Sequence, residues 1–240
     1  TTAAERKPSF TAFVVKSAAL ALKDSPYANR RVCRRPWLWF LGPRLQKFET
    51  CDIAVAAERD MPGVEFCAFA DIIRDADQQS MNDINDWLRD LATCDVNTNK
   101  QWREFSTLIT RLPRFLSTFL IRLPIFVPSM WSKYRGGAVL ISSPAKYGVD
   151  SVLTTWTWPL GISFGFVKDR PIAVDGELVV RPTFNLTLNF DRRVMAGAQG
   201  ARFFKRMVDA LENAREQIGP YMQADDAPAS IGQIARHHVA

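Results

Sequence analysis

The sequence predicts one α/β or α+β domain, because helical and strand patterns alternate along its 240 residues. Near the N-terminus, apolar residues behind Ser9 recur with the period of a helix, and residues 197–211 repeat this pattern. Between them, residues 184–190 (FNLTLNF) alternate strictly, which is typical of a strand with one buried face. A composition of 47% hydrophobic and 23% charged residues supports a sizeable core. We expect a single domain over residues 1–221 and a polar tail at 222–240.

The first hundred residues contain signals for two helices and a buried strand. The N-terminal helix should end at the Ser-Pro dipeptide at 25–26, and a basic, aromatic stretch at 31–47 predicts a strand edge or a loop. Residues 51–57 (CDIAVAA) have the composition of a buried strand, which the Met-Pro-Gly at 61–63 closes. Ser80 then caps a helix with an apolar stripe that we interpret as core. That stripe consists of Met81, Ile84, Leu88 and Leu91.

A Leu-Pro-rich insertion at about 97–134 interrupts this alternation. Its central part, 105–130, contains three prolines, and its only charges are Arg111, Arg114 and Arg122. A spanning helix needs about 20 uninterrupted apolar residues, so the segment is not expected to cross a membrane. Two interpretations remain: a helical insertion packed on the protein, which we favour, or a basic, apolar surface for a membrane or a partner.

From Gly137 onward the sequence predicts mainly β structure. Residues 172–174 and 178–180 flank an Asp-Gly dipeptide at 175–176, which indicates a hairpin about a tight turn. Gly197 then leads into a helix. Its expected core stripe is Ala201, Phe204, Val208 and Leu211.

Residue counts exclude several classes of function. The four cysteines lie 16 to 27 residues apart, without C-x-x-C spacing, and fit a reducing compartment: the cytoplasm or an equivalent, with the mitochondrial matrix not excluded. The net charge of +6 suits an anionic ligand such as coenzyme A or an acidic carrier. Neither a metal site nor a nucleic-acid partner is indicated. The two histidines, His237 and His238, stand together in the polar tail, and the polar start without an initiator Met suggests a trimmed chain.

Four blocks of the sequence follow a known pattern in the same order. Residues 168–198 contain a hairpin with Asp-Gly, an alternating strand and DRRVMAG, similar to D-H-R-x-x-D-G. Residues 137–150 (GAVLISSPAKYGVD) are similar, without gaps, to G-T-F-T-I-S-N-L-G-x-F-G-V-D. With 52–64 and 72–92, these blocks resemble the catalytic domain of the 2-oxoacid dehydrogenase acyltransferases over most of residues 8–215, apart from the insertion. We expect a standalone member, since no lipoyl or linker sequence is present.

The resemblance implies a two-layer domain of the chloramphenicol acetyltransferase-like fold, with a mixed sheet, helices on one face, and trimers whose active sites lie between neighbours. In that family the histidine of D-H-R removes a proton from the thiol of coenzyme A or dihydrolipoamide. The thiolate attacks the acyl thioester, and a hydroxyl from the I-S-N region stabilises the oxyanion. The implied partners are copies of the chain, a larger acyltransferase or dehydrogenase-type complex, and an acyl carrier. No bound cofactor is expected, and a coenzyme A thioester is the implied ligand.

The sequence departs from the motif at the positions that perform the chemistry. Arg192 stands at the histidine position and Ala196 at the aspartate position, whereas Asp191, Arg193 and Gly197 keep the frame. Because the pKa of arginine exceeds about 12, Arg192 cannot take up a proton at neutral pH. General-base catalysis contributes a factor of about 10² to 10⁴ and needs a group with a pKa near neutrality.

Ser142 occupies the serine position and is the candidate oxyanion donor, with Ser143 in place of the asparagine. The candidates for substrate binding are Ser143, Asp191, Arg193 and Gly197. We favour a degenerate acyltransferase that acts as a binding, structural or regulatory trimer subunit, with Arg192 paired to Asp191 or to a ligand phosphate. The alternative is an active acyltransferase with a histidine-independent mechanism, in which Arg192 favours the thiolate. A third interpretation is a membrane-surface protein that acts through residues 105–130.

Overall fold

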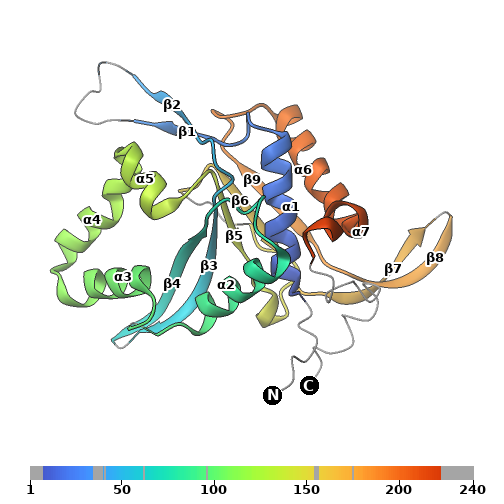
Figure 1. The fold of residues 1–240 in the computed structure, drawn as a ribbon, viewed down its shortest axis with the longest axis horizontal. Coiled ribbons are helices and arrows are strands. Elements are labelled where there is room, and N and C mark those ends of the chain that lie inside the picture. Colours follow the sequence, from blue (N-terminus) through green and yellow to red (C-terminus); the bar gives the residue numbers. More distant parts are fainter. Residues whose placement is uncertain are drawn as a thin grey trace.

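The computed structural model describes residues 8–34, 40, 42–61, 63–95, 97–153, 157–174 and 176–222. Within these segments helices and strands alternate, and one sheet carries most of the core (Figure 1). The expected polar tail, with His237 and His238, lies outside the described residues from residue 223 onward. The expected limits of the domain and of its insertion stay predictions.

The central sheet is mixed and has five strands. In chain order these are β3 (Ile53–Met61), β4 (Val64–Ile73), β5 (Val139–Ser142), β6 (Leu160–Phe164) and β9 (Leu186–Phe190). Their order across the sheet is β4-β3-β5-β6-β9. The three central strands are parallel, and the two outer strands run antiparallel to their neighbours. The sheet confirms the predicted α/β class, and β3 confirms the strand expected at 51–57.

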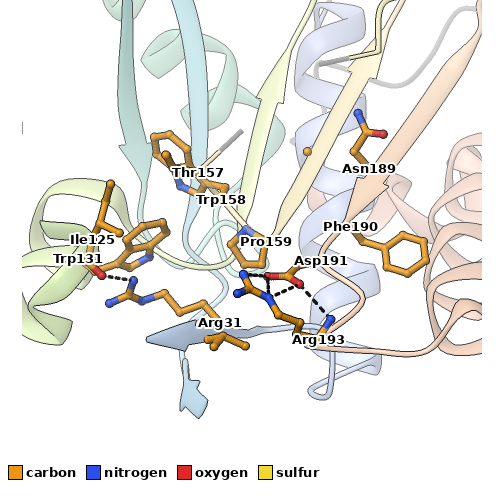
Figure 2. A pocket seen from close by; sticks show the side chains of 12 residues that line it. Arg31, Ile125, Trp131, Thr157, Trp158, Pro159, Asn189, Phe190, Asp191 and Arg193 are labelled. Carbon is orange, nitrogen blue, oxygen red and sulfur yellow. Dashed lines mark hydrogen bonds and ion pairs between the residues drawn. The ribbon is translucent and has the colours of Figure 1, made fainter. Parts of the chain in front are cut away.

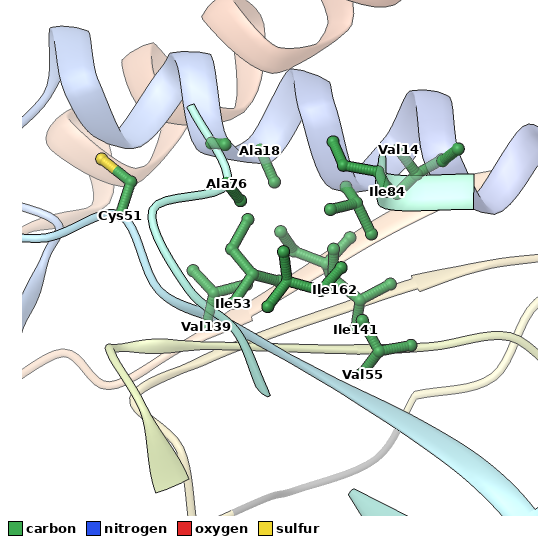
Figure 3. Packing of buried hydrophobic residues seen from close by; sticks show 14 of the residues in the cluster. Val14, Ala18, Cys51, Ile53, Val55, Ala76, Ile84, Val139, Ile141 and Ile162 are labelled. Atoms are coloured by element: carbon green, nitrogen blue, oxygen red, sulfur yellow. The ribbon is translucent and has the colours of Figure 1, made fainter. Parts of the chain in front are cut away.

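Three helices cover one face of this sheet (Figure 1). They are α1 (Phe10–Asp24), α2 (Met81–Thr93) and α6 (Gly197–Glu212), the last followed by the short α7 (Ala214–Gln217) and η3 (Gly219–Tyr221). Figure 3 shows Val14 and Ala18 of α1 above the sheet residues Ile53, Val139 and Ile162. All residues of α1 from position 12 to 22 are buried, so this helix forms the centre of the apolar core.

Serine residues begin both predicted helices in the first half of the chain. The Ser9 hydroxyl accepts a hydrogen bond from the Ala12 N–H at 3.2 Å, and Ser80 accepts one from the Asp83 N–H at 3.1 Å. Asp83 in turn accepts from the Ser80 N–H, which completes a capping box. The predicted caps at Ser9 and Ser80 are confirmed, as is the end of α1 at Ser25.

The predicted core stripe of α6 is wrong by one residue. The buried side of the helix consists of Gly200, Phe203, Met207 and Ala210, whereas Ala201 is exposed and Phe204, Val208 and Leu211 are half-buried. The reason lies at Gly200, because a Cβ there would come within 2.8 Å of the Phe190 ring. The absence of a side chain lets the helix lie directly on β9, and this contact decides which of two adjacent apolar stripes faces the sheet.

The strand β9 begins two residues later than expected and is only half-buried along its length. Its apolar side chains Leu186, Leu188 and Phe190 pack against the core, as the alternation predicts. Burial is incomplete because β9 is the outer strand of the sheet among the described residues.

One lysine is buried in this core. Lys16 on α1 is fully covered, and its ammonium group donates to the carbonyl oxygens of Ala76, Asp77 and Gln79 at 3.2, 2.7 and 2.8 Å. It also lies 3.4 Å from the centre of the Tyr221 ring. Burial lowers the pKa of Lys16 to about 8, since the charged form loses its water.

This lysine predicts a pH dependence of stability. Because the pKa of Lys16 is lower in the folded than in the unfolded chain, the unfolded chain binds more protons between about pH 8 and 10.5. The free energy of unfolding of the wild type, relative to Lys16→Met, should therefore rise with pH across that window, by at most about 1.4 kcal/mol per pH unit. Urea unfolding of both proteins at several pH values measures this difference. A difference that stays constant from pH 8 to 10.5 would contradict it.

The Leu-Pro insertion folds into three helices that stand beside the β4 edge of the sheet (Figure 1). They are α3 (Lys100–Arg111), α4 (Arg114–Phe126) and α5 (Pro128–Arg135). Prolines punctuate them as expected, before α4, within it and at the start of α5. The buried rings of Trp102 and Trp131 attach α3 and α5 to the core side of the molecule. In α4 only Ser117 and Pro124 are buried, and the carbonyl of Ile125 is bound by Arg31. The insertion is therefore packed through α3, α5 and the end of α4, and one side of α4 stays exposed.

Two ribbons extend from this body (Figure 1). β1 (Arg30–Cys33) pairs with β2 (Arg44–Lys47), and β7 (Lys168–Val174) pairs with β8 (Glu177–Thr183). The second ribbon confirms the predicted hairpin, and Gly176 has a positive φ of 87° in its turn, a conformation that favours glycine. Asp175, the other predicted turn residue, lies outside the described residues.

Candidate active site

Ser142 is the last residue of β5, at the C-terminal end of the central strand of the sheet. It lines a pocket of about 490 Å³ whose walls come from α1, β3 and α2. Most of these walls are apolar, and they include Val55, Ala57 and Leu88. Among the described residues, the Ser142 hydroxyl has no hydrogen-bond partner. A hydroxyl in such an apolar setting is able to donate to a developing oxyanion.

Ser143, by contrast, uses its hydroxyl within the fold. It donates to the Phe164 carbonyl at 3.0 Å and accepts from the Ala145 N–H at 3.2 Å. These bonds hold the turn into η2 (Ala145–Tyr147) against the end of β6. A substrate that bound the Ser143 hydroxyl would have to compete with these bonds. A role of Ser143 in substrate binding stays a prediction.

The acidic residue of the DRR sequence pairs with the second arginine. Asp191 receives hydrogen bonds from the side chain of Arg193 at 2.9 and 2.6 Å and from its backbone N–H at 2.9 Å. This guanidinium holds the pKa of the Asp191 carboxyl below its ordinary value. Of the two partners expected for Arg192, Asp191 is instead bound by Arg193, which the turn after β9 brings over the carboxylate. Pairing of Arg192 with a ligand phosphate stays a prediction.

Arg192 itself is exposed in the turn between β9 and α6. Within the described part of the chain it makes neither a hydrogen bond nor an ion pair. Its guanidinium therefore stands uncompensated at the position that the family motif gives to histidine.

Ala196 is the N-cap residue of α6 and has no side-chain acceptor for the first turn. The Gln199 side chain accepts from the Ala196 N–H at 2.9 Å, so only one half of a capping box is present. Gly197 follows as the first helical residue, and a Cβ there would meet no atom within 4 Å. The N-cap of α6 thus has no side-chain acceptor for the first turn, at the position where the family motif has an aspartate.

This gap predicts that Ala196→Asp stabilises the protein. An N-cap carboxylate accepts an orphan N–H and interacts favourably with the helix dipole, which contributes about 1 kcal/mol. Urea unfolding at neutral pH should show this gain, and Ala196→Leu, which has no acceptor, is the matched control. Equal stability of the Asp and Leu variants would refute the capping role.

Ser142 and Arg192 do not meet within one chain. Ser142 lies opposite Ser163 of β6, which lies opposite Thr187 of β9, whereas Arg192 follows the far end of β9 at Phe190. The two positions are therefore separated by at least about 10 Å along the strands. A site that uses both must combine two chains, as the resemblance implies.

A second pocket, of about 400 Å³, lies beside Asp191 and Arg193 (Figure 2). Its other wall contains Arg31, Trp131 and Trp158. The Arg31 guanidinium lies 4.1 Å from the centre of the Trp131 ring. This pocket was not expected from the sequence, because its walls come from segments about a hundred residues apart.

Arginines on this side hold the insertion to the body. Arg31 is buried and donates to the Gln46 side chain at 2.7 Å and to the Ile125 carbonyl at 2.9 Å. Arg135 donates to the Ile121 carbonyl at 3.2 Å and stacks on Trp158 at 4.7 Å. Burial lowers the pKa of both guanidinium groups. Both bind backbone carbonyls in the second half of α4. For Arg31, the sequence signal for this role is the basic, aromatic stretch at 31–47.

The cysteines carry no site. Cys33, Cys51, Cys67 and Cys94 are all buried and unpaired. Burial raises the pKa of the Cys51 thiol to about 12, which disfavours the reactive thiolate. No group of side chains that could hold a metal ion occurs among the described residues.

Comparison with known proteins identifies relatives of the whole described body. Residues 131–218 match the family model of the 2-oxoacid dehydrogenases acyltransferase (catalytic domain). The chain is 28% identical over 216 residues to the dihydrolipoyllysine-residue succinyltransferase component of the 2-oxoglutarate dehydrogenase complex of Rickettsia typhi, covering 88% of this chain and 43% of that protein. It is 24% identical over 208 residues to the dihydrolipoyllysine-residue acetyltransferase component of the pyruvate dehydrogenase complex of Zymomonas mobilis, covering 85% and 38%. The chain thus spans about two fifths of the length of these relatives.

Solved structures of acyltransferases share the fold. Dihydrolipoamide acetyltransferase of Azotobacter vinelandii superposes with a TM-score of 0.60 at 22% identity, covering 88% of this chain and 71% of that chain. The roles of a serine, a histidine and an asparagine in the catalytic mechanism of that enzyme have been investigated. The cubic core of the pyruvate dehydrogenase multienzyme complex gives a TM-score of 0.57 at 21% identity, covering 88% and 72%. In sequence over residues 131–218, and in fold over most of its length, the chain is similar to the catalytic domain of the 2-oxoacid dehydrogenase acyltransferases.

Proposed function

We propose that this chain is a catalytically degenerate acyltransferase subunit, which serves a larger assembly by binding or by structure. The observation that carries this proposal is the exposed guanidinium of Arg192 at the motif's histidine position. A guanidinium stays charged at neutral pH and accepts no proton, so it cannot activate a thiol as a general base.

Among the described residues, the neighbouring side chains offer no replacement base. The Asp191 carboxylate is bound by Arg193, and its lowered pKa makes it a weaker base than an ordinary aspartate. The pocket beside Ser142 has Arg89 as its one charged lining residue among those described. The two histidines of the sequence, at positions 237 and 238, lie outside the described residues.

The assembly is proposed to be a trimer. The separation of Ser142 and Arg192 within one chain favours sites shared between neighbouring chains. The relatives are components of dehydrogenase complexes, and one solved relative is the cubic core of a multienzyme complex. We therefore propose that the chain joins an acyltransferase or dehydrogenase-type complex, with a coenzyme A thioester or an acyl carrier as the ligand class.

A transfer assay tests the absence of catalysis. The purified chain is mixed with acetyl-coenzyme A and dihydrolipoamide at neutral pH, and formation of the new thioester is followed. We expect the rate of the protein-free reaction. Turnover on the scale of ordinary enzymes, about 1 s⁻¹ or more, would overturn the proposal.

A histidine-independent acyltransferase is the second candidate, and the unpartnered Ser142 hydroxyl favours it. In this mechanism Arg192 of one chain stabilises the thiolate of the acceptor, while Ser142 of its neighbour donates to the oxyanion. It predicts measurable transfer that Arg192→Ala and Ser142→Ala each abolish. If both variants keep the wild-type rate, this mechanism is excluded.

A further inference from the structure

The helix α4 exposes an aromatic and basic face that the described residues leave uncovered. Phe115 and Phe119 are 77% and 59% exposed, and they are one turn apart on the same side of the helix. Arg122 continues this side by one further turn and is exposed as well. Scattered exposed apolar residues are common in proteins, but two neighbouring phenylalanines on a projecting helix form a patch.

The charges close in sequence to this patch have one sign. Arg111 and Arg114 are exposed at the turn between α3 and α4, close in sequence to Phe115. The sequence contains no aspartate or glutamate from residue 105 to residue 135. Phenylalanine on one side and arginine around it is the pattern of helices that lie in the interface of an anionic bilayer.

Among the described residues no single helix combines the length and the apolar character of a span, and the pair α4 and α5 reaches both only across a bend of 107°. A helix of this length is suited to lie in the plane of a lipid surface, with its phenylalanines at the level of the acyl chains.

We infer that α4 is a docking surface for anionic phospholipid bilayers. Phe115 and Phe119 insert, while Arg111, Arg114 and Arg122 contact lipid phosphates. A second copy of the chain is the less suitable occupant, because packing of identical patches would bring their arginines together. This inference does not depend on the proposed loss of catalysis.

Vesicle sedimentation with the full chain tests the inference. We expect binding to phosphatidylcholine vesicles that contain phosphatidylglycerol, and much weaker binding to pure phosphatidylcholine or when salt rises from about 0.05 M to about 0.5 M. Phe115→Ser/Phe119→Ser should lower vesicle affinity about tenfold or more, because the apolar insertion is lost. Replacing one of the three arginines by glutamine should lower it about fivefold.

Leu178→Ser is the matched control, since Leu178 is 78% exposed on the β7–β8 ribbon, and it should leave vesicle binding unchanged. The inference is overturned if the chain ignores anionic vesicles at low salt, or if the double Phe variant binds like the wild type. It is equally overturned if that variant instead changes the oligomer size measured by light scattering while vesicle binding is absent, because the patch would then join copies of the chain.

Discussion

Arg192→His combined with Ala196→Asp is expected to produce thiol-dependent acyl transfer in a chain that we propose to be inactive. The double variant restores D-H-R-x-x-D-G in a frame whose Asp191–Arg193 pair is already formed. A positioned general base contributes a factor of about 10² to 10⁴, so the rate with acetyl-coenzyme A and dihydrolipoamide should rise by at least about 100-fold. The Ser142 hydroxyl, which is unpartnered among the described residues, is available to the same reaction.

Two further variants separate chemistry from folding in this experiment. Arg192→Gln with Ala196→Asp has the same helix cap without an imidazole, and it should stay inactive. Adding Ser142→Ala to the histidine variant should remove most of the gain, by a factor of about 10² or more. A folded double variant with no gain in rate would contradict the proposal that the departures at residues 192 and 196 silence this site.

Trp131→Ala is expected to have the largest effect on stability, a loss of about 3–5 kcal/mol. The Trp131 ring is 1% exposed, its Nε1–H donates to the Gly137 carbonyl at 3.1 Å, and the Arg31 guanidinium stacks on it. Truncation removes this contact area, leaves a buried carbonyl unpaired and takes the aromatic partner from a buried cation. Urea unfolding of the two proteins measures the difference.

Trp131→Phe is the control for this prediction, because it retains most of the ring area but loses the hydrogen bond. It should cost about 1–2 kcal/mol. Phe115→Ala, at an exposed ring on the same insertion, should change the free energy of unfolding by no more than about 0.5 kcal/mol. A change below about 1 kcal/mol for Trp131→Ala would show that the ring does not anchor the insertion.

Local signals in the sequence predicted the elements of the fold well. Serine caps and strict alternation depend on neighbouring residues only, and they located α1, α2 and β9 to within about two residues. The face of α6 was mispredicted because apolar residues stand side by side at Phe203 and Phe204 and again at Met207 and Val208. Periodicity fits either stripe, and the choice depends on a sheet contact that a local pattern does not contain.

The sequence motif supplied candidate site residues, whose roles stay predictions, and it did not predict their contacts. Motif positions identified Ser142, Arg192 and Ala196, yet the partner of Asp191 depends on the conformation of a turn. The pocket lined by Arg31 and Trp131 depends on residues a hundred positions apart, and no pairing rule for short segments predicts such a contact.

The distance between Ser142 and Arg192 has a consequence for mixed assemblies. If each site takes its serine from one protomer and its residue 192 from the next, a protomer without the imidazole disables one site only. Its own Ser142 continues to serve a neighbour that carries histidine. The activity of a hetero-oligomer with a histidine-bearing relative should then decline in direct proportion to the fraction of this chain. A steeper decline is expected only if one inactive protomer inactivates all sites of the oligomer.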